Sequence, residues 1–149
     1  MQPPTLVHYA TVDTSFEFES NLGQRLTLVV PADQASDEDA RQVNIQISDE
    51  GLVAHTSVFM SKSEDLPLPL FLRELAENWH GWQGTRAWES FDEQLRVDAH
   101  HDGIGWVTLG ITLQPNLVPS PWSVRCELAI EPGEQLQRLA DGVDALLSA

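Results

Sequence analysis

Three residue types in this chain could do chemistry: adjacent histidines, a lone cysteine and clustered tryptophans. His100 and His101 stand directly before Asp102, and imidazole and carboxylate groups are common metal ligands. Adjacent residues of a strand point to opposite faces, so the two histidines are not expected to ligate one ion. We expect them instead to lie, partly exposed, at the end of a hairpin. There one imidazole could recognise a partner through its pH-sensitive charge.

No other motif predicts catalysis. Cys126 lies on the apolar side of an alternating segment, which favours an inert core thiol over a nucleophile. It is the chain's one cysteine, so a disulfide within the chain is excluded. The segment Gly81-Trp82-Gln83-Gly84 lacks the Lys-Ser/Thr pair of a phosphate loop, and no serine has the surroundings of a nucleophile elbow. We therefore expect no enzymatic activity, no metal and no cofactor.

Three of the five tryptophans fall within residues 79–88. Trp79 lies on a helical apolar stripe and Trp122 on the apolar side of a strand pattern, so both are expected in the core. Two interpretations stay open for the other three: an aromatic cluster that seals the helix exit against the sheet, or an exposed platform for a ligand or partner. The residues of this secondary candidate surface are Trp82, Trp88, Trp106, His100 and His101.

The charge balance carries most information about partners. Twenty-three acidic residues face eight basic ones, a net charge of −15, and no basic patch is present. Such a chain repels nucleic acids and anionic membranes. The acidity either serves solubility alone or favours a basic protein partner. The densest acidic positions are our predicted partner-binding residues: Asp33, Asp37, Glu38 and Asp39 on a solvated loop over 31–41, Asp49 and Glu50 at a hairpin tip, and Glu64 and Asp65 before a helix.

The elements that position these residues follow from periodicity. Alternating apolar and polar residues predict about eight strands, among them 26–30, 52–60, 95–99 and 107–113. Asp49-Glu50-Gly51 is typical of a hairpin turn, and Asp102-Gly103 of a two-residue type I′ turn. Apolar stripes predict helices over 69–80 and 133–147, and Gly81 could end the first. We predict a single α+β domain over 1–149, with one antiparallel sheet and both helices packed on one of its faces.

The second half of the chain, residues 68–147, resembles a known arrangement. The residues that carry the resemblance are Leu70-Phe71-Leu72, a Trp-x-Gly step, His101-Asp102-Gly103-x-Gly105, Val107-x-Leu109-x-Ile111 and Glu131-Pro132-Gly133-Glu134-Gln135-Leu136. This half is similar to a group of small bacterial proteins common in actinomycetes and, more distantly, to WapI-type immunity proteins of polymorphic toxin systems. The resemblance implies a protein that acts by binding and brings no catalytic residues with it.

These observations lead to a non-catalytic binding protein as the first hypothesis, most concretely an acidic immunity protein that neutralises a basic toxin domain. A housekeeping or regulatory interaction module is the alternative, as a homodimer paired through an edge strand. A small-ligand binder or enzyme using the Trp82, Trp88 and Trp106 surface is the third. The N-terminus has no signal-peptide pattern and no apolar run approaches a membrane span, so we expect a cytoplasmic protein without membrane contact.

Overall fold

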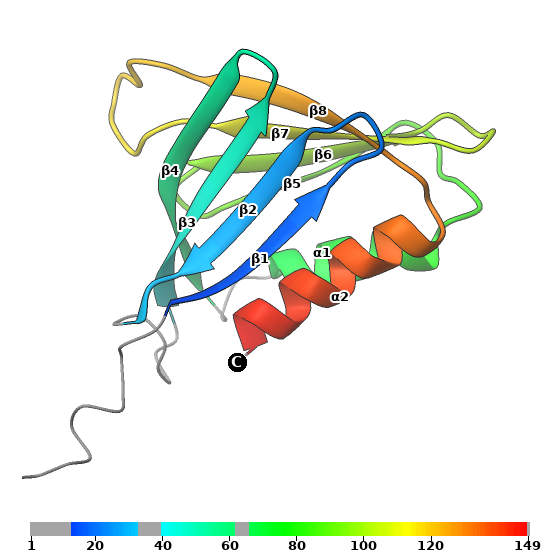
Figure 1. Ribbon diagram of the computed structural model, residues 1–149, viewed down its shortest axis with the longest axis horizontal. Helices are drawn as coiled ribbons and strands as arrows, with labels where there is room; N and C mark the ends of the chain where they lie inside the picture. Colours follow the sequence, from blue (N-terminus) through cyan, green and yellow to red (C-terminus); the bar gives the residue numbers. More distant parts are fainter. Residues whose placement is uncertain (1–12, 33–39, 62–65, 149) are drawn as a thin grey trace, which may run out of the picture.

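The computed structural model describes residues 13–32, 40–61 and 66–148, and its strands form two antiparallel sheets of four (Figure 1). The first sheet contains β1 (Thr14–Glu19), β2 (Arg25–Val30), β3 (Ala40–Asp49) and β4 (Leu52–Ser61), each paired with the next. The second contains β5 (Thr85–Glu89), β6 (Leu95–His101), β7 (Val107–Leu113) and β8 (Val124–Ile130) in the same manner. Helix α1 (Leu68–Glu77) joins the two sheets, and α2 (Glu134–Ser148) follows β8.

The α+β class, the eight antiparallel strands and the two helices confirm the sequence prediction. The prediction of one continuous sheet is wrong, because α1 separates two meanders of four strands each. The alternation of apolar and polar residues within a strand indicates which side chains face a core, but it does not indicate which strands belong to the same sheet. That choice depends on contacts between residues far apart in the chain.

Both sheets and both helices enclose the same core. The buried apolar side chains form one cluster, which includes Leu28 of β2, Leu72 of α1, Leu109 of β7 and Leu139 of α2. Helix α2 contacts α1, β1 and β2, and Figure 1 shows the two helices side by side below the sheets. The apolar stripes that predicted the helices are therefore the surfaces that the helices bury.

Helix α1 starts close to the predicted position but ends earlier than predicted. Pro67 is its N-cap and Pro69 lies in its first turn, where proline's missing N–H removes no helical hydrogen bond. At the other end the backbone N–H of Asn78 reaches the carbonyls of Glu74 and Leu75, and its side chain donates to Glu74 O at 2.7 Å. Asn78 therefore caps the helix three residues before Gly81, to which the sequence analysis assigned that role.

The start of α2 is held by a side chain that reaches backwards. Gln135 Oε1 accepts a hydrogen bond of 2.9 Å from the backbone N–H of Glu131, and Gln135 Nε2 donates to Asn21 Oδ1 in the β1–β2 turn. The first contact satisfies a donor outside the helix, as in a capping box. The second ties the helix start to the first sheet.

The β6–β7 connection differs from the predicted two-residue turn. His101 pairs with Val107, so residues 102–106 form a five-residue loop. Asp102 Oδ1 accepts hydrogen bonds from the backbone N–H groups of Ile104, Gly105 and Trp106 at 2.8, 2.9 and 3.0 Å. A carboxylate that satisfies three backbone donors stabilises a longer loop, which the Asp-Gly pair alone did not indicate.

The predicted acidic loop over 31–41 is shorter at its C-terminal end. Ala40 and Arg41 belong to β3, and the Arg41 side chain is buried, with Nη2 donating to the Leu147 carbonyl of α2 at 2.6 Å. Residues 33–39 of that segment lie outside the described residues. Among the helices of the described ranges, none is both long and apolar enough to cross a bilayer.

Candidate functional site

Two of the eight predicted partner-binding acids lie in the described part of the chain. These are Asp49 and Glu50, at the tip of the β3–β4 hairpin, and both are exposed. The other six, for which the structure offers no test, are Asp33, Asp37, Glu38, Asp39, Glu64 and Asp65. The site can therefore be built only around the hairpin tip.

The hairpin tip is a two-residue turn formed by Glu50 and Gly51. Asp49 pairs with Leu52, and Gly51 has a φ of +77°, a left-handed conformation that costs glycine little. Asp49 Oδ1 accepts a hydrogen bond of 2.7 Å from the Glu50 backbone N–H. The turn therefore holds two carboxylates side by side in solvent, as the Asp-Glu-Gly pattern predicted.

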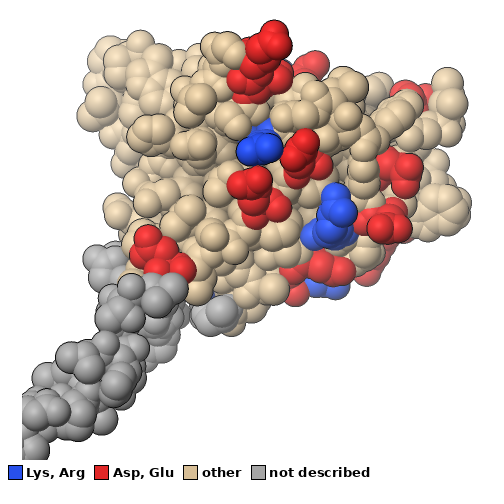
Figure 2. Space-filling view, in the orientation of Figure 1, with Lys and Arg blue, Asp and Glu red and all other residues tan. Residues whose placement is uncertain are grey.

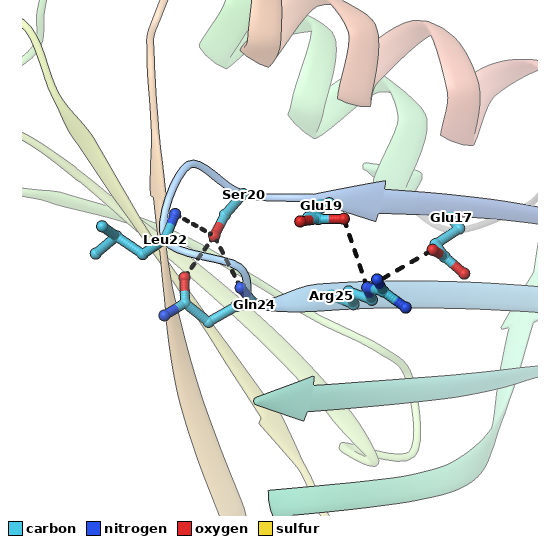
Figure 3. Close-up of polar contacts among 6 residues, drawn as sticks. All are labelled: Glu17, Glu19, Ser20, Leu22, Gln24 and Arg25. Carbon is cyan, nitrogen blue, oxygen red and sulfur yellow. Dashed lines mark hydrogen bonds and ion pairs between the residues drawn. The ribbon is translucent and has the colours of Figure 1, made fainter. Parts of the chain in front are cut away.

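The β1–β2 turn lies beside this tip and is ordered by one buried hydroxyl. Ser20 Oγ accepts hydrogen bonds from the backbone N–H groups of Leu22 and Gln24 at 3.3 and 3.2 Å, and it donates to Gln24 Oε1 (Figure 3). Gln24 Nε2 in turn donates to Asp49 Oδ2 at 3.4 Å, which joins the two turns. The sequence predicted the turn at Asp49-Glu50-Gly51 but not its contact with the β1–β2 turn.

Two further acids lie next to these turns on the outer face of the first sheet. Figure 3 shows Arg25 in contact with both Glu17 and Glu19. Its Nε lies 3.5 Å from Glu19 and 3.9 Å from Glu17, and Arg25 pairs with Ser48, the residue before Asp49. All three charged side chains are more than half exposed, so these ion pairs stabilise the fold little. We call Glu17, Glu19, Asp49 and Glu50 the acidic surface.

Asp49 of the acidic surface also acts electrostatically on Cys126 of the second sheet. The pKa of the buried Cys126 thiol is raised, first by burial and then by the negative charges of Asp49 and Glu127. A buried thiol with a raised pKa is a poor nucleophile, which agrees with the predicted core role. In Figure 2, acidic side chains surround the few basic ones on this side of the molecule.

The secondary candidate surface is mostly an internal support. Trp88 is buried in the core and donates its indole N–H to the Leu66 carbonyl at 2.6 Å. Trp82 is partly buried, donates to the Ala99 carbonyl at 3.1 Å and meets His101 edge to face. Trp82, in the segment that follows α1, fits the interpretation of a seal at the helix exit, whereas Trp88 supports the segment that enters the helix.

His101 is 6% exposed, in contrast to the predicted partly exposed pair. Its Nδ1 accepts a hydrogen bond of 2.8 Å from the Gly103 backbone N–H, so Nε2 carries the proton that it donates to the Trp79 carbonyl at 2.9 Å. His100 points to the other face and is exposed, as strand geometry predicted. Both His101 nitrogens are thus engaged by the backbone, which assigns the ring a structural role.

Exposure of other tryptophans also differs from prediction. Trp79 is 52% exposed, because α1 ends before it, and Trp122 is 38% exposed, because β8 begins two residues after it. Trp106, for which the sequence left both interpretations open, is 46% exposed in the β6–β7 loop. Within the described ranges no group of three or more His, Cys, Asp or Glu side chains is placed to hold a metal ion.

Sequence reasoning missed a cavity of about 390 Å³ at the opposite end of the first sheet. Among the described residues it is lined by Arg41 and Met60 of the sheet, Arg73 of α1, and Asp144 and Leu147 of α2. Arg73 binds Asp144 at 2.7 Å, which links the two helices across the cavity. Arg41 could have signalled this site, but it stood in a segment interpreted as a solvated loop.

Two antiparallel meanders closed by two helices, with an acidic surface at one end, define this molecule as an acidic α+β domain. The chain belongs to a family of unknown function, DUF6228, whose model matches residues 18–149. Comparison with curated proteins found no match. Comparison with solved structures found none either.

Proposed function

We propose that this protein is a non-catalytic, cytoplasmic immunity protein that neutralises a basic toxin domain by binding it directly. The observation that carries the proposal is the net charge of −15 together with exposed carboxylates at the β3–β4 tip and on the outer face of the neighbouring β1. Opposite charge on the toxin would speed the encounter, and such steering weakens as salt rises. The distant resemblance of residues 68–147 to WapI-type immunity proteins supports the same function.

The acidic surface suits rapid recognition of a basic partner. Glu17 and Glu19 stand on strand β1, and Asp49 and Glu50 stand on a short turn. Ser20 and Gln24 order the neighbouring turn, so the surface needs little reorganisation on binding. Its one cation, Arg25, is held between Glu17 and Glu19. A lysine or arginine of the partner could take the place of Arg25 at these carboxylates.

The proposal requires a large secreted protein encoded directly upstream of this chain, and the experiment uses the C-terminal domain of that protein. That domain is produced in a host with and without the chain, and growth is measured. Protection is expected, with association in vitro that slows as salt rises. An unprotected host, with no complex formed by the purified proteins, would refute the proposal.

Charge reversal locates the contact. Asp49→Lys with Glu50→Lys should slow association clearly at low salt, by about tenfold or more. The matched control is Asp92→Lys with Glu93→Lys, which reverses two neighbouring acids in the turn between β5 and β6. The variant Asp37→Lys, Glu38→Lys and Asp39→Lys tests the other acidic segment separately. Equal association rates for the parent and all three variants would exclude steering by these acids.

A further inference from the structure

Strand β4 differs from the three other strands that end a sheet. It is ten residues long, Leu52–Ser61, and contains no charged residue and no proline. The remaining end strands carry charges: Glu17 and Glu19 on β1, Arg86 and Glu89 on β5, and Arg125 and Glu127 on β8. Charges and prolines are the usual means by which proteins prevent an open strand from pairing with another molecule. Strand β4 lacks both in a chain of net charge −15.

The backbone of β4 offers unpaired groups in a regular row. The two-residue turn makes Asp49 and Leu52 a hydrogen-bonded pair, and such pairs alternate with non-bonded ones along an antiparallel ladder. Val53, His55, Ser57 and Phe59 consequently direct their N–H and C=O groups away from β3. In the sheet formed by the described strands, β4 has β3 as its one neighbour.

The side chains of the same four residues lie on the outer face of the sheet. Val53 is 66% exposed and Phe59 is 40% exposed. Their cross-strand partners on β3 are also uncharged: Ser48 opposite Val53, Gln46 opposite His55, Asn44 opposite Ser57 and Gln42 opposite Phe59. We call these eight residues the uncharged face.

We propose that β4 pairs antiparallel with β4 of a second copy of this chain, which forms a two-fold dimer with one continuous eight-stranded sheet. The pattern of β4 favours this occupant, because the strand is complementary to itself when two copies run antiparallel. Two copies of charge −15 repel each other, and the uncharged face lets them approach without bringing carboxylates together. A two-fold axis also closes the assembly, so no open edge of β4 remains.

The open backbone groups determine the register of this dimer. Centring the pair on Thr56 places Val53 opposite Phe59 of the second copy and His55 opposite Ser57. All four residues with free groups then exchange hydrogen bonds, and the two exposed apolar side chains of each copy cover those of the other. The dimer would therefore pair the open backbone groups of β4 and bury its exposed apolar side chains.

The first test uses the unsubstituted chain. Sedimentation at increasing protein concentration should show a monomer–dimer equilibrium, and added salt should strengthen the dimer because it screens repulsion between acidic copies. This salt effect is opposite in sign to that expected for toxin binding. Amide hydrogen exchange at Val53, His55, Ser57 and Phe59 should slow as the dimer forms. A monomer at every concentration and salt level would overturn the proposal.

The second test introduces charge at the dimer centre. His55→Glu with Ser57→Glu places carboxylates opposite one another, and it should weaken the dimer by about tenfold or more. The control, Ser15→Glu with Ser123→Glu, adds the same charge at exposed positions away from β4 and should change dimerisation little. Circular dichroism establishes that both variants are folded. Equal loss of the dimer in variant and control would overturn the proposal.

The third test addresses the register directly. A mixture of Val53→Cys and Phe59→Cys proteins should form a covalent dimer on mild oxidation, whereas neither protein alone should do so. The native Cys126 is buried and should not contribute. If Val53→Cys cross-links by itself and no mixed dimer with Phe59→Cys forms, pairing centred on Thr56 is contradicted. Neither result depends on whether the protein binds a toxin.

Discussion

Arg125 of β8 crosses Gly110 of β7 to bind Asp98 of β6. Arg125 Nη1 and Nη2 lie 2.7 and 3.1 Å from the two carboxylate oxygens of Asp98, and Nη2 also lies 2.9 Å from Glu127. The hydrogen bond to Asp98 is the main reason why the Arg125 pKa is raised. A side chain at position 110 of β7 would block this path. Because glycine stands there, the Arg125–Asp98 ion pair can link strands β6 and β8 across β7.

Substitution of Gly110 tests this arrangement. A Cβ added at Gly110 would overlap the Arg125 guanidinium, which Asp98 and Glu127 hold in place. The added Cβ would displace the exposed end of the Arg125 side chain and break its ion pair with Asp98, so we expect Gly110→Ala to lower the free energy of unfolding by about 1 kcal/mol. Gly105→Ala is the control, because nothing lies within 4 Å of its added Cβ, and it should change stability by less than about 0.5 kcal/mol. Urea denaturation measures both, and equal effects would refute the explanation.

A second glycine lies where a helix meets a strand. Gly142 is in the middle of α2, and a Cβ there would overlap the ring of Phe16 on β1. Alanine favours an exposed helix by about 1 kcal/mol over glycine, yet we expect Gly142→Ala to destabilise the protein by about 1–3 kcal/mol. In a Phe16→Ala background the same change should stabilise it. Thermal unfolding of the four proteins of this cycle gives the coupling, and additive effects would contradict the contact.

The core prediction concerns Leu109 of β7, which is almost fully buried among residues of both sheets and both helices. Removing most of its side chain leaves a cavity, so Leu109→Ala should cost about 2–5 kcal/mol of unfolding free energy. Ile104→Ala removes similar apolar volume from the exposed β6–β7 loop and should cost less than about 0.5 kcal/mol. Comparable losses in guanidinium titrations would show that Leu109 does not lie in a shared core.

The last prediction concerns pH. Backbone hydrogen bonds from Gly105, Ile104 and Trp106 lower the pKa of Asp102 from 3.8 to about 2. A carboxyl with a lowered folded-state pKa stabilises the fold above its unfolded value, and the stabilisation disappears as pH falls from 3.8 to about 2. The stability difference between the parent and Asp102→Ala should therefore be present at neutral pH and shrink across this interval.

The control for Asp102 is the amide. Asp102→Asn keeps an oxygen that can accept from the three N–H groups but does not titrate, so its own pH dependence over this interval should be smaller than the parent's. Unfolding followed by tryptophan fluorescence from neutral to acid pH gives all three curves. A parent and an Asp102→Asn variant that lose stability in parallel would contradict the assigned pKa.

The buried side of each strand and helix could be predicted from the amino-acid pattern. Alternation placed Leu109 and Cys126 in the core, and the helical stripe of α2 placed Leu139 and Val143 there, as the structure confirms. Asp49 and Glu50 were also predicted at an exposed hairpin tip, because turn chemistry resides in a few adjacent residues. These properties are local, so they can be inferred from neighbours in the chain.

Tertiary structure alone decided how these elements meet. The division into two sheets, the burial of His101 against the Trp79 carbonyl and the exposure of Trp79 depend on where distant segments end and pack. The acidic surface likewise exists because strand pairing brings Glu19, Arg25 and Ser48 into one row beside Asp49. Periodicity predicts which face of a strand or helix a residue lies on. It does not predict which residue of a distant segment that residue contacts, because long-range packing determines such contacts.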